Sequence, residues 1–228
     1  MTTASEGGVY ERLRTAVLSL DLLPGEGLSE RGLEALLGAS RTPIRAALMR
    51  LENEGLAQRE GRAWRVAPID LSEIRAVMEY REAIEVAIVS HAVDRADDAA
   101  VAALAAIAQA GRAHDDAETV LRDGSDFHLA LAHLSGNPFL VDAMEGVLIR
   151  LARTRWLEVR TPESRAHAGA EHLAIVAAVA ARDAERARLL VAEHSRGTSD
   201  RLLSFLSQER LRMRGRGLSI VETAPPAA

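Results

Sequence analysis

The chain has 228 residues, of which 48% are hydrophobic and 27% charged, so one or two domains with a real core are expected. No stretch of about 18 uncharged apolar residues is present, so no membrane-spanning helix is expected. Cysteine is absent, which excludes disulfides and thiolate metal sites, and the N-terminus has no secretory signal pattern. We therefore expect a cytoplasmic protein, and the net charge of −5 argues against non-specific binding to polyanions.

The first part of the chain predicts helices joined by tight turns. The segment from Tyr10 to Leu20 has the apolar spacing of an amphipathic helix, and Pro24 with the glycine after it forces a turn. A short helix follows, which Ser29 can cap and Gly38 ends. Together with the next helix, this arrangement predicts a helix-turn-helix between residues 28 and 62.

The second helix of this pair begins after Ser40, which can cap it, and runs to about residue 54. Its apolar residues recur at helical spacing, which predicts one buried stripe. The members of this stripe are Ile44, Ala47, Leu48 and Leu51. Thr42 and Arg45 lie about a quarter turn away, with Arg41 beside them. Arginines at the start of such a helix fit a recognition helix in the major groove, and a solvated helix face is the alternative interpretation.

Beyond this pair the pattern changes twice. Short strand candidates at 58–59 and 64–66 surround Gly61 and predict a hairpin. From Asp70 onward, six segments have helical patterns and no strand-like alternation interrupts them, which predicts an all-α bundle. They lie at residues 71–94, 97–114, 117–135, 138–160, 164–181 and 184–208.

Three histidines lie on apolar faces of three different predicted helices: His128, His172 and His194. A histidine in such a place is commonly a hydrogen-bonded core residue. Three that converge, however, can bind a borderline metal ion such as Zn²⁺ or Ni²⁺ and leave a coordination position open. Both alternatives stand on the residues alone.

Two other polar residues have a local and a functional interpretation. Arg81 precedes Glu85 by one helical turn and can form an i,i+4 ion pair, or it can clamp a carboxylate in two-point fashion. Asn137 can cap the helix that Pro138 opens.

The N-terminal motifs resemble those of GntR-type bacterial transcription regulators, from Val9 to Ala67. The segments that carry the resemblance are VYERLRTAVLSLDLLPGEGLSE and SRTPIRAALMRLENEGL. The resemblance implies a winged helix-turn-helix that contacts DNA through Arg31, Ser40, Arg41, Thr42, Arg45 and Arg62. The family usually has glycine where this chain has Ala63, so the backbone of the wing would have less freedom here.

The second part resembles the FCD effector domain of the FadR subgroup of these regulators. The motifs are YREAIE, DFHLALAHLSGNPFL, EHLAIVAAVAARD and the pair EH at 193–194. The resemblance implies that a small organic acid binds near Arg81, Asn137 and the histidines, and that His128, His172 and His194 are metal ligands in metal-dependent members. Such members usually have an Asp four residues before the first histidine, where this chain has Gly124. Asp123 and Asp126 are the nearest substitutes.

We therefore predict a mostly α fold in which a winged helix-turn-helix with a short β wing precedes an FCD-like bundle of six to seven helices. The expected ranges are 1–68 for the DNA-binding domain, 69–208 for the effector and dimerisation domain, and 209–228 for a disordered tail. The predicted function is that of a homodimeric repressor on an inverted-repeat DNA operator, modulated by a small carboxylate and a divalent metal. The alternative is a hydrolase that uses the three histidines, against which the chain has no His-Glu-x-x-His run.

Overall fold

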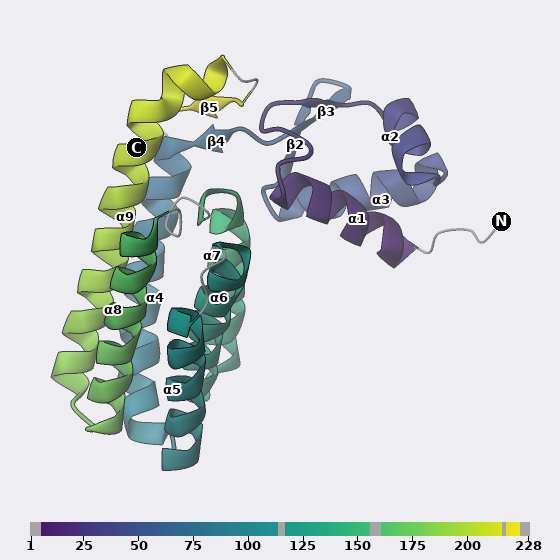
Figure 1. Cartoon of the computed structure of the whole chain (residues 1–228). Coiled ribbons are helices and arrows are strands. Elements are labelled where there is room, and N and C mark those ends of the chain that lie inside the picture. The colour runs from purple at the N-terminus through teal and green to yellow at the C-terminus, as the bar shows by residue number, and fades with distance from the viewer. Residues whose placement is uncertain (1–5, 114–116, 156–160, 216–217, 224–228) are drawn as a thin grey trace, which may run out of the picture. The chain divides into compact units, whose positions relative to one another are not determined.

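A computed structural model describes residues 6–113, 117–155, 161–215 and 218–223 (Figure 1). The chain divides into two compact units. The first contains residues 1–73 together with 206–228, and the second contains residues 74–205. None of the described helices is both long and apolar enough to cross a membrane.

The described part of the first unit is a winged helix-turn-helix followed by two further short strands, as Figure 1 shows for the N-terminal part of the chain. Its antiparallel sheet has the strand order β1-β3-β2. The elements are α1 (Glu6–Leu18), β1 (Gly27–Leu28), α2 (Glu30–Leu37), α3 (Arg41–Asn53), β2 (Ala57–Glu60) and β3 (Ala63–Val66). The predicted helix-turn-helix and hairpin are confirmed, whereas α1 begins earlier than predicted and ends at Leu18.

The helix ends follow the predicted capping residues. The side chain of Ser29 accepts a hydrogen bond from the backbone N–H of Gly32, and Gly38 ends α2 in a left-handed conformation. Ser40 occupies the N-cap of α3, although its side chain makes no capping hydrogen bond. Local sequence signals therefore place both helices of the motif.

The predicted apolar stripe of α3 forms the core of this unit. Its four members are buried, and α3 packs against α1. The α1 residues of this core are Val9, Leu13 and Val17. Because one side of α3 is fixed in this way, the start of its other side, which contains Arg41, Thr42 and Arg45, is exposed to solvent.

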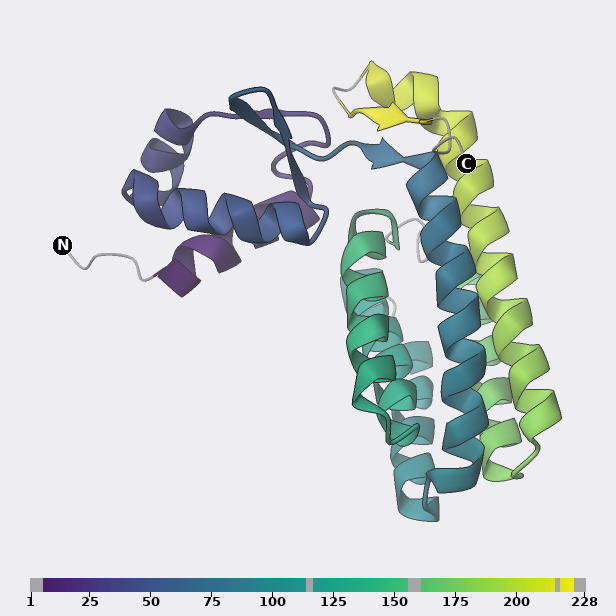
Figure 2. The ribbon, with the colours of Figure 1, turned by 180° about the vertical axis from the view of Figure 1, so that it is seen from behind.

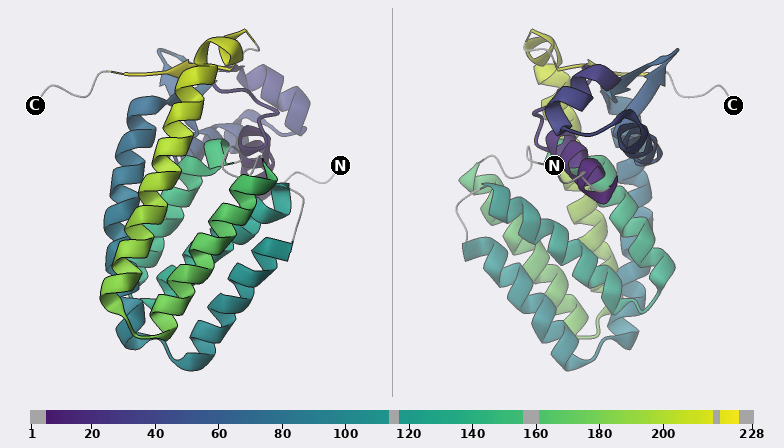
Figure 3. Two further views of the ribbon diagram at one scale, coloured as in Figure 1. Left: turned by 60° about the vertical axis from the view of Figure 1, so that its left-hand side comes forward. Right: turned by 90° about the vertical axis from the view of Figure 1, so that its right-hand side faces the viewer.

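The second unit is built from helices that run alongside one another (Figures 2 and 3). The helices of the described chain that contribute to it are α4 (Leu71–Arg95), α5 (Asp98–Ala113), α6 (Ala117–Leu134), α7 (Pro138–Arg155), α8 (Pro162–Ala180) and α9 (Ala184–Arg214). α5 packs against α6 and α8, and α6 packs against α7. The predicted all-α bundle is confirmed, and α9 extends six residues beyond its predicted end at 208. The last five residues of the predicted segment 138–160 lie outside the described residues.

The prediction of a disordered tail from residue 209 is wrong for the described residues. After α9, β5 (Ile220–Val221) forms a parallel pair with β4 (Ile69–Asp70). Ile220 is 2% exposed, and the backbone N–H of Ser219 donates to the carbonyl of Pro24. The tail is ordered because it buries an apolar β-branched residue and satisfies the backbone of the linker.

Three further hydrogen bonds fix this segment. The Thr223 hydroxyl and backbone N–H both donate to the carboxylate of Asp70, and the Ser72 hydroxyl donates to the Thr223 carbonyl. Burial alone would raise the pKa of Asp70, but the hydrogen bonds from Thr223 and Ser72 leave this pKa below its usual value. At Gly25, an added Cβ would lie 2.5 Å from the Cβ of Ser219, so the close approach of the tail requires glycine there. The two compact units divide at residues 73 and 205, and the predicted domain ranges 1–68 and 69–208 stay a prediction.

We expect the substitution Ile220→Ala to lower the free energy of unfolding of the first unit by about 2 kcal/mol, because it removes a buried apolar side chain. Trp64 is buried in this unit, so its fluorescence in urea reports this transition when Trp156 is replaced by phenylalanine. Val221→Ala, which truncates the half-buried neighbour, is the matched control. Midpoints of both variants equal to that of the wild type would show that β5 contributes nothing to this unit.

Candidate DNA-binding face and histidine cluster

The arginines of α3 form an exposed basic face that is paired with acids of α2. Arg45 Nε lies 2.6 Å from Glu30 Oε1, and Arg41 Nε lies 3.3 Å from Glu34 Oε1. The two arginine side chains remain 62% and 63% exposed. The hydrogen bond from Arg45 is the main cause that lowers the pKa of Glu30. The arginines are therefore held in place and remain accessible to a nucleic acid.

The other predicted DNA contacts are also at the surface. Arg31 is exposed in the first turn of α2, and Ser40 and Thr42 are exposed at the start of α3. Arg62 is exposed in the turn of the hairpin and lines a cavity of about 390 Å³ together with Glu30. We call the six residues that the family resemblance predicts to contact DNA the candidate DNA-binding face: Arg31, Ser40, Arg41, Thr42, Arg45 and Arg62.

The departure from the family at Ala63 leaves the hairpin intact. Ala63 is the first residue of β3, where it pairs with Glu60 and is exposed. Gly61 supplies the positive φ, 62°, that the turn requires. A side chain at position 63 is therefore compatible with a wing of this type.

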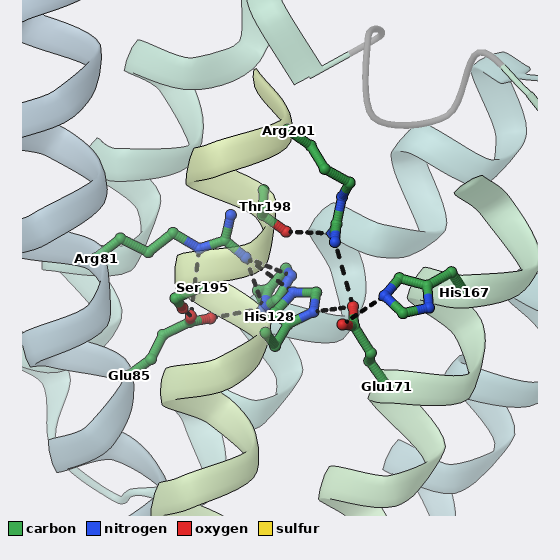
Figure 4. Close-up of polar contacts among 9 residues, drawn as sticks. Arg81, Glu85, His128, His167, Glu171, Ser195, Thr198 and Arg201 are labelled. Atoms are coloured by element: carbon green, nitrogen blue, oxygen red, sulfur yellow. Dashed lines mark hydrogen bonds and ion pairs between the residues drawn. The ribbon is translucent and has the colours of Figure 1, made fainter. Parts of the chain in front are cut away.

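The bundle brings the three predicted histidines together, and Figure 4 shows His128 among its polar neighbours. His128 of α6, His172 of α8 and His194 of α9 are 2%, 8% and 3% exposed. One ligand nitrogen from each lies within 4.8 Å of the others. Phe127 stacks on His172 with 4.0 Å between the ring centroids, which fixes that ring in the core. We call these three residues the histidine cluster.

Two carboxylates lie behind the cluster and orient its rings (Figure 4). His128 Nδ1 is 2.7 Å from Glu85 Oε1, and His194 Nδ1 is 2.8 Å from Glu171 Oε2. A histidine whose Nδ1 faces a carboxylate presents Nε2 on its other side, and this arrangement is common among metal-binding histidines. The chemistry of the cluster therefore fits a divalent ion bound through imidazole nitrogens.

Arg81 is fully buried and reaches the same cluster from α4. Its Nη2 lies 2.7 Å from His128 Nε2 and 3.4 Å from His194 Nε2. Its Nε donates to Glu85 at 3.3 Å, so the predicted i,i+4 pair and the orientation toward the cluster coexist. Its remaining terminal nitrogen, Nη1, is buried and makes no hydrogen bond to the described residues. An acceptor at this position would satisfy the donor.

Sequence reasoning missed part of this site. Ser195 is buried and donates to Glu85 at 2.5 Å, so the acid is held by two helices. Glu171 contacts His194, His167 and Arg201. The position of Glu171 beside His172 in the sequence gave no sign of this, because a helix directs neighbouring side chains about 100° apart.

Other predicted residues lie outside the cluster. The Asn137 side-chain oxygen accepts a hydrogen bond from the backbone N–H of Phe139, which is the local capping interpretation. Asp126 is exposed, and among the described residues neither it nor Asp123 joins the group of atoms that could hold a metal. The spacing already indicated this difference, because a two-residue step turns about 200° around a helix.

A winged helix with exposed arginines on its recognition helix, joined to a separate helical domain with a buried polar site, defines a DNA-binding transcription regulator. Residues 6–66 match the family of bacterial regulatory proteins called gntR, and residues 76–197 match the FCD domain. The chain therefore belongs to the GntR family of transcription regulators, in the group that has an FCD domain.

Similar proteins agree with this assignment. An HTH-type transcriptional regulator in an unstable DNA locus of Streptomyces ambofaciens is 32% identical over 194 residues, which cover 84% of this chain and 82% of that protein. The Nta operon transcriptional regulator of Aminobacter aminovorans is 28% identical and matches 83% of this chain and 90% of its own length. The solved structure of McbR/YncC from E. coli has the same fold, with a TM-score of 0.73, 23% identity, and coverage of 92% and 99%. The matched domains and these relatives are regulators, so the chain is not assigned as a hydrolase.

We expect Glu85→Ala to destabilise the bundle by about 3–5 kcal/mol, because it leaves the buried guanidinium of Arg81 without its anion. The change is measured by urea denaturation followed by circular dichroism. Glu82→Ala is the control on the same helix. It breaks a partly exposed pair with Arg196, and we expect a change of at most about 1 kcal/mol. Similar losses for both variants would contradict the view that Glu85 compensates a buried charge.

Proposed function

We propose that this regulator is a homodimeric repressor whose affinity for its operator falls when a small carboxylate binds in the bundle. The observation that carries the proposal is Arg81: a fully buried guanidinium with an orphaned Nη1 beside three imidazoles. A planar guanidinium suits a carboxylate because it can donate two parallel hydrogen bonds. The neighbouring imidazole nitrogens add further polar groups around such a ligand.

We further propose that the histidine cluster can bind a divalent transition ion such as Zn²⁺ or Ni²⁺. Three nitrogen ligands with an open position are typical of such ions. The carboxylates behind His128 and His194 favour this chemistry. With Gly124 in place of the acid of metal-dependent members, this chain supplies no carboxylate ligand at that position, so an oxygen of the effector or water would complete the coordination.

The connectivity of α4 offers a route from the ligand to DNA. Arg81 lies ten residues after Leu71, the first residue of α4, a span of about 15 Å along a helix. β4 directly precedes that helix and is part of the first unit. A ligand that prefers one position of α4 over another therefore biases the DNA-binding unit by its difference in affinity for the two states.

We expect Arg45→Ala to weaken operator binding by about 1–3 kcal/mol, because the residue is an exposed donor at the start of the recognition helix. Fluorescence anisotropy measures this with a duplex selected from random DNA by the wild-type protein. Arg188→Ala in α9 removes the same charge from a residue paired with Glu185 and is the control. If both variants bind the selected duplex equally well, the candidate DNA-binding face is misassigned.

We expect a small carboxylate to release the operator probe from the wild-type protein, when acetate, lactate, succinate and glutarate are tested separately. The double variant Arg81→Met/Glu85→Gln should bind the probe but no longer respond, because both the clamp and its buried counter-charge are removed. Arg196→Met, outside the cluster, should respond like the wild type. If no carboxylate of this set changes the anisotropy, the part of the proposal that concerns the effector fails. The part that concerns DNA binding still stands.

A further inference from the structure

Arg81 lies beside the histidine nitrogens to which a metal ion would bind. The Nδ1 atoms of His128 and His194 lie beside carboxylates, and the Nε2 atoms lie on the other side of each ring. Both Nε2 atoms have Arg81 Nη2 beside them, at 2.7 Å and 3.4 Å (Figure 4). A guanidinium is always charged, so a permanent cation occupies this part of the cluster.

The charge balance of the cluster opposes a second cation. A metal ion binds imidazole nitrogen at about 2.1 Å, so an ion on His128 Nε2 would lie within about 5 Å of Arg81 Nη2. The interaction is weakly screened because both residues are buried. Glu85 contacts the guanidinium directly, whereas Glu171 is 22% exposed and shared with His167 and Arg201. The buried carboxylate of Glu85 therefore balances the charge of Arg81, and its single negative charge does not also balance a divalent ion.

We propose that Arg81 is a resident cation that competes with a divalent metal for the Nε2 atoms of His128 and His194. The metal binds tightly only when a carboxylate neutralises the guanidinium and draws it away. This inference rests on the proposed metal site, and it assigns to that site a positive coupling between metal and anion. By thermodynamic reciprocity, each ligand then raises the affinity for the other by the same factor.

The contacts of Arg81 allow such a movement. Nη1 makes no hydrogen bond to the described residues, so a carboxylate can bind there before the contacts of Nη2 are lost. Glu85 does not depend on Arg81 alone, because Ser195 also donates to it and His128 lies against it. When the guanidinium changes partners, Glu85 keeps its hydrogen bond from Ser195 and its contact with His128.

The test measures Zn²⁺ affinity by competition with a chromogenic chelator. We expect Arg81→Met to bind Zn²⁺ at least about tenfold more tightly than the wild type, since a neutral side chain of similar length removes the repulsion. Arg196→Met removes an arginine of α9 outside the cluster and should leave the affinity unchanged. His172→Ala should abolish binding and so identify the site. Acetate should tighten Zn²⁺ binding to the wild type and have no such effect on Arg81→Met.

The results distinguish a failure of the competition by Arg81 from a failure of the proposed metal site. Equal or weaker Zn²⁺ binding by Arg81→Met, with binding still lost in His172→Ala, overturns the competition and leaves the metal site standing. Absence of Zn²⁺ binding in the wild type and in every variant overturns both. Circular dichroism checks folding, and Arg81→Met/Glu85→Gln, which removes both charges of the buried pair, takes the place of Arg81→Met if the single variant unfolds.

Discussion

The burial of one guanidinium, that of Arg81, constrains three helices of the bundle. A cation taken out of water costs several kcal/mol unless an anion and hydrogen-bonding partners surround it. Arg81 obtains its anion, Glu85, from one turn further along its own helix. Glu85 is in turn held by Ser195 of α9 and lies against His128 of α6. Because this network needs α4, α6 and α9 at set positions, a ligand that moves the guanidinium also acts on the packing of these helices.

In the DNA-binding unit, by contrast with Arg81, the arginines at the start of α3 are exposed to water. The two that begin α3 are fixed by carboxylates of α2 rather than by burial. These exposed pairs contribute little stability, and their effect is to offset the basic charge in the absence of DNA. A recognition helix of this kind gains affinity from the local placement of its arginines, and such binding is sensitive to salt.

Features set by interactions within one or two helical turns can be predicted from this sequence, whereas contacts between distant segments cannot. Helices were predicted to within a few residues because periodicity and caps such as Ser29 and Gly38 act over one or two turns. The pairing of Ile220 with Ile69 joins residues about 150 positions apart through strands of two residues, which leave no periodic signal. The histidines could be named from their apolar faces and from family resemblance. The contact between Glu171 and His194 depends on which helices are neighbours, and one sequence does not reveal this.

The placement of the two acids beside the histidine cluster determines which kind of ligand the cluster favours. Glu85 and Glu171 face the Nδ1 side of the imidazoles, and neither Asp123 nor Asp126 joins the group of ligand atoms. On the other side of these rings, the Nε2 atoms lie beside the guanidinium of Arg81, whose paired acid is Glu85. Such a lining favours an anion first and a metal second, because the anion supplies the negative charge that the protein places elsewhere.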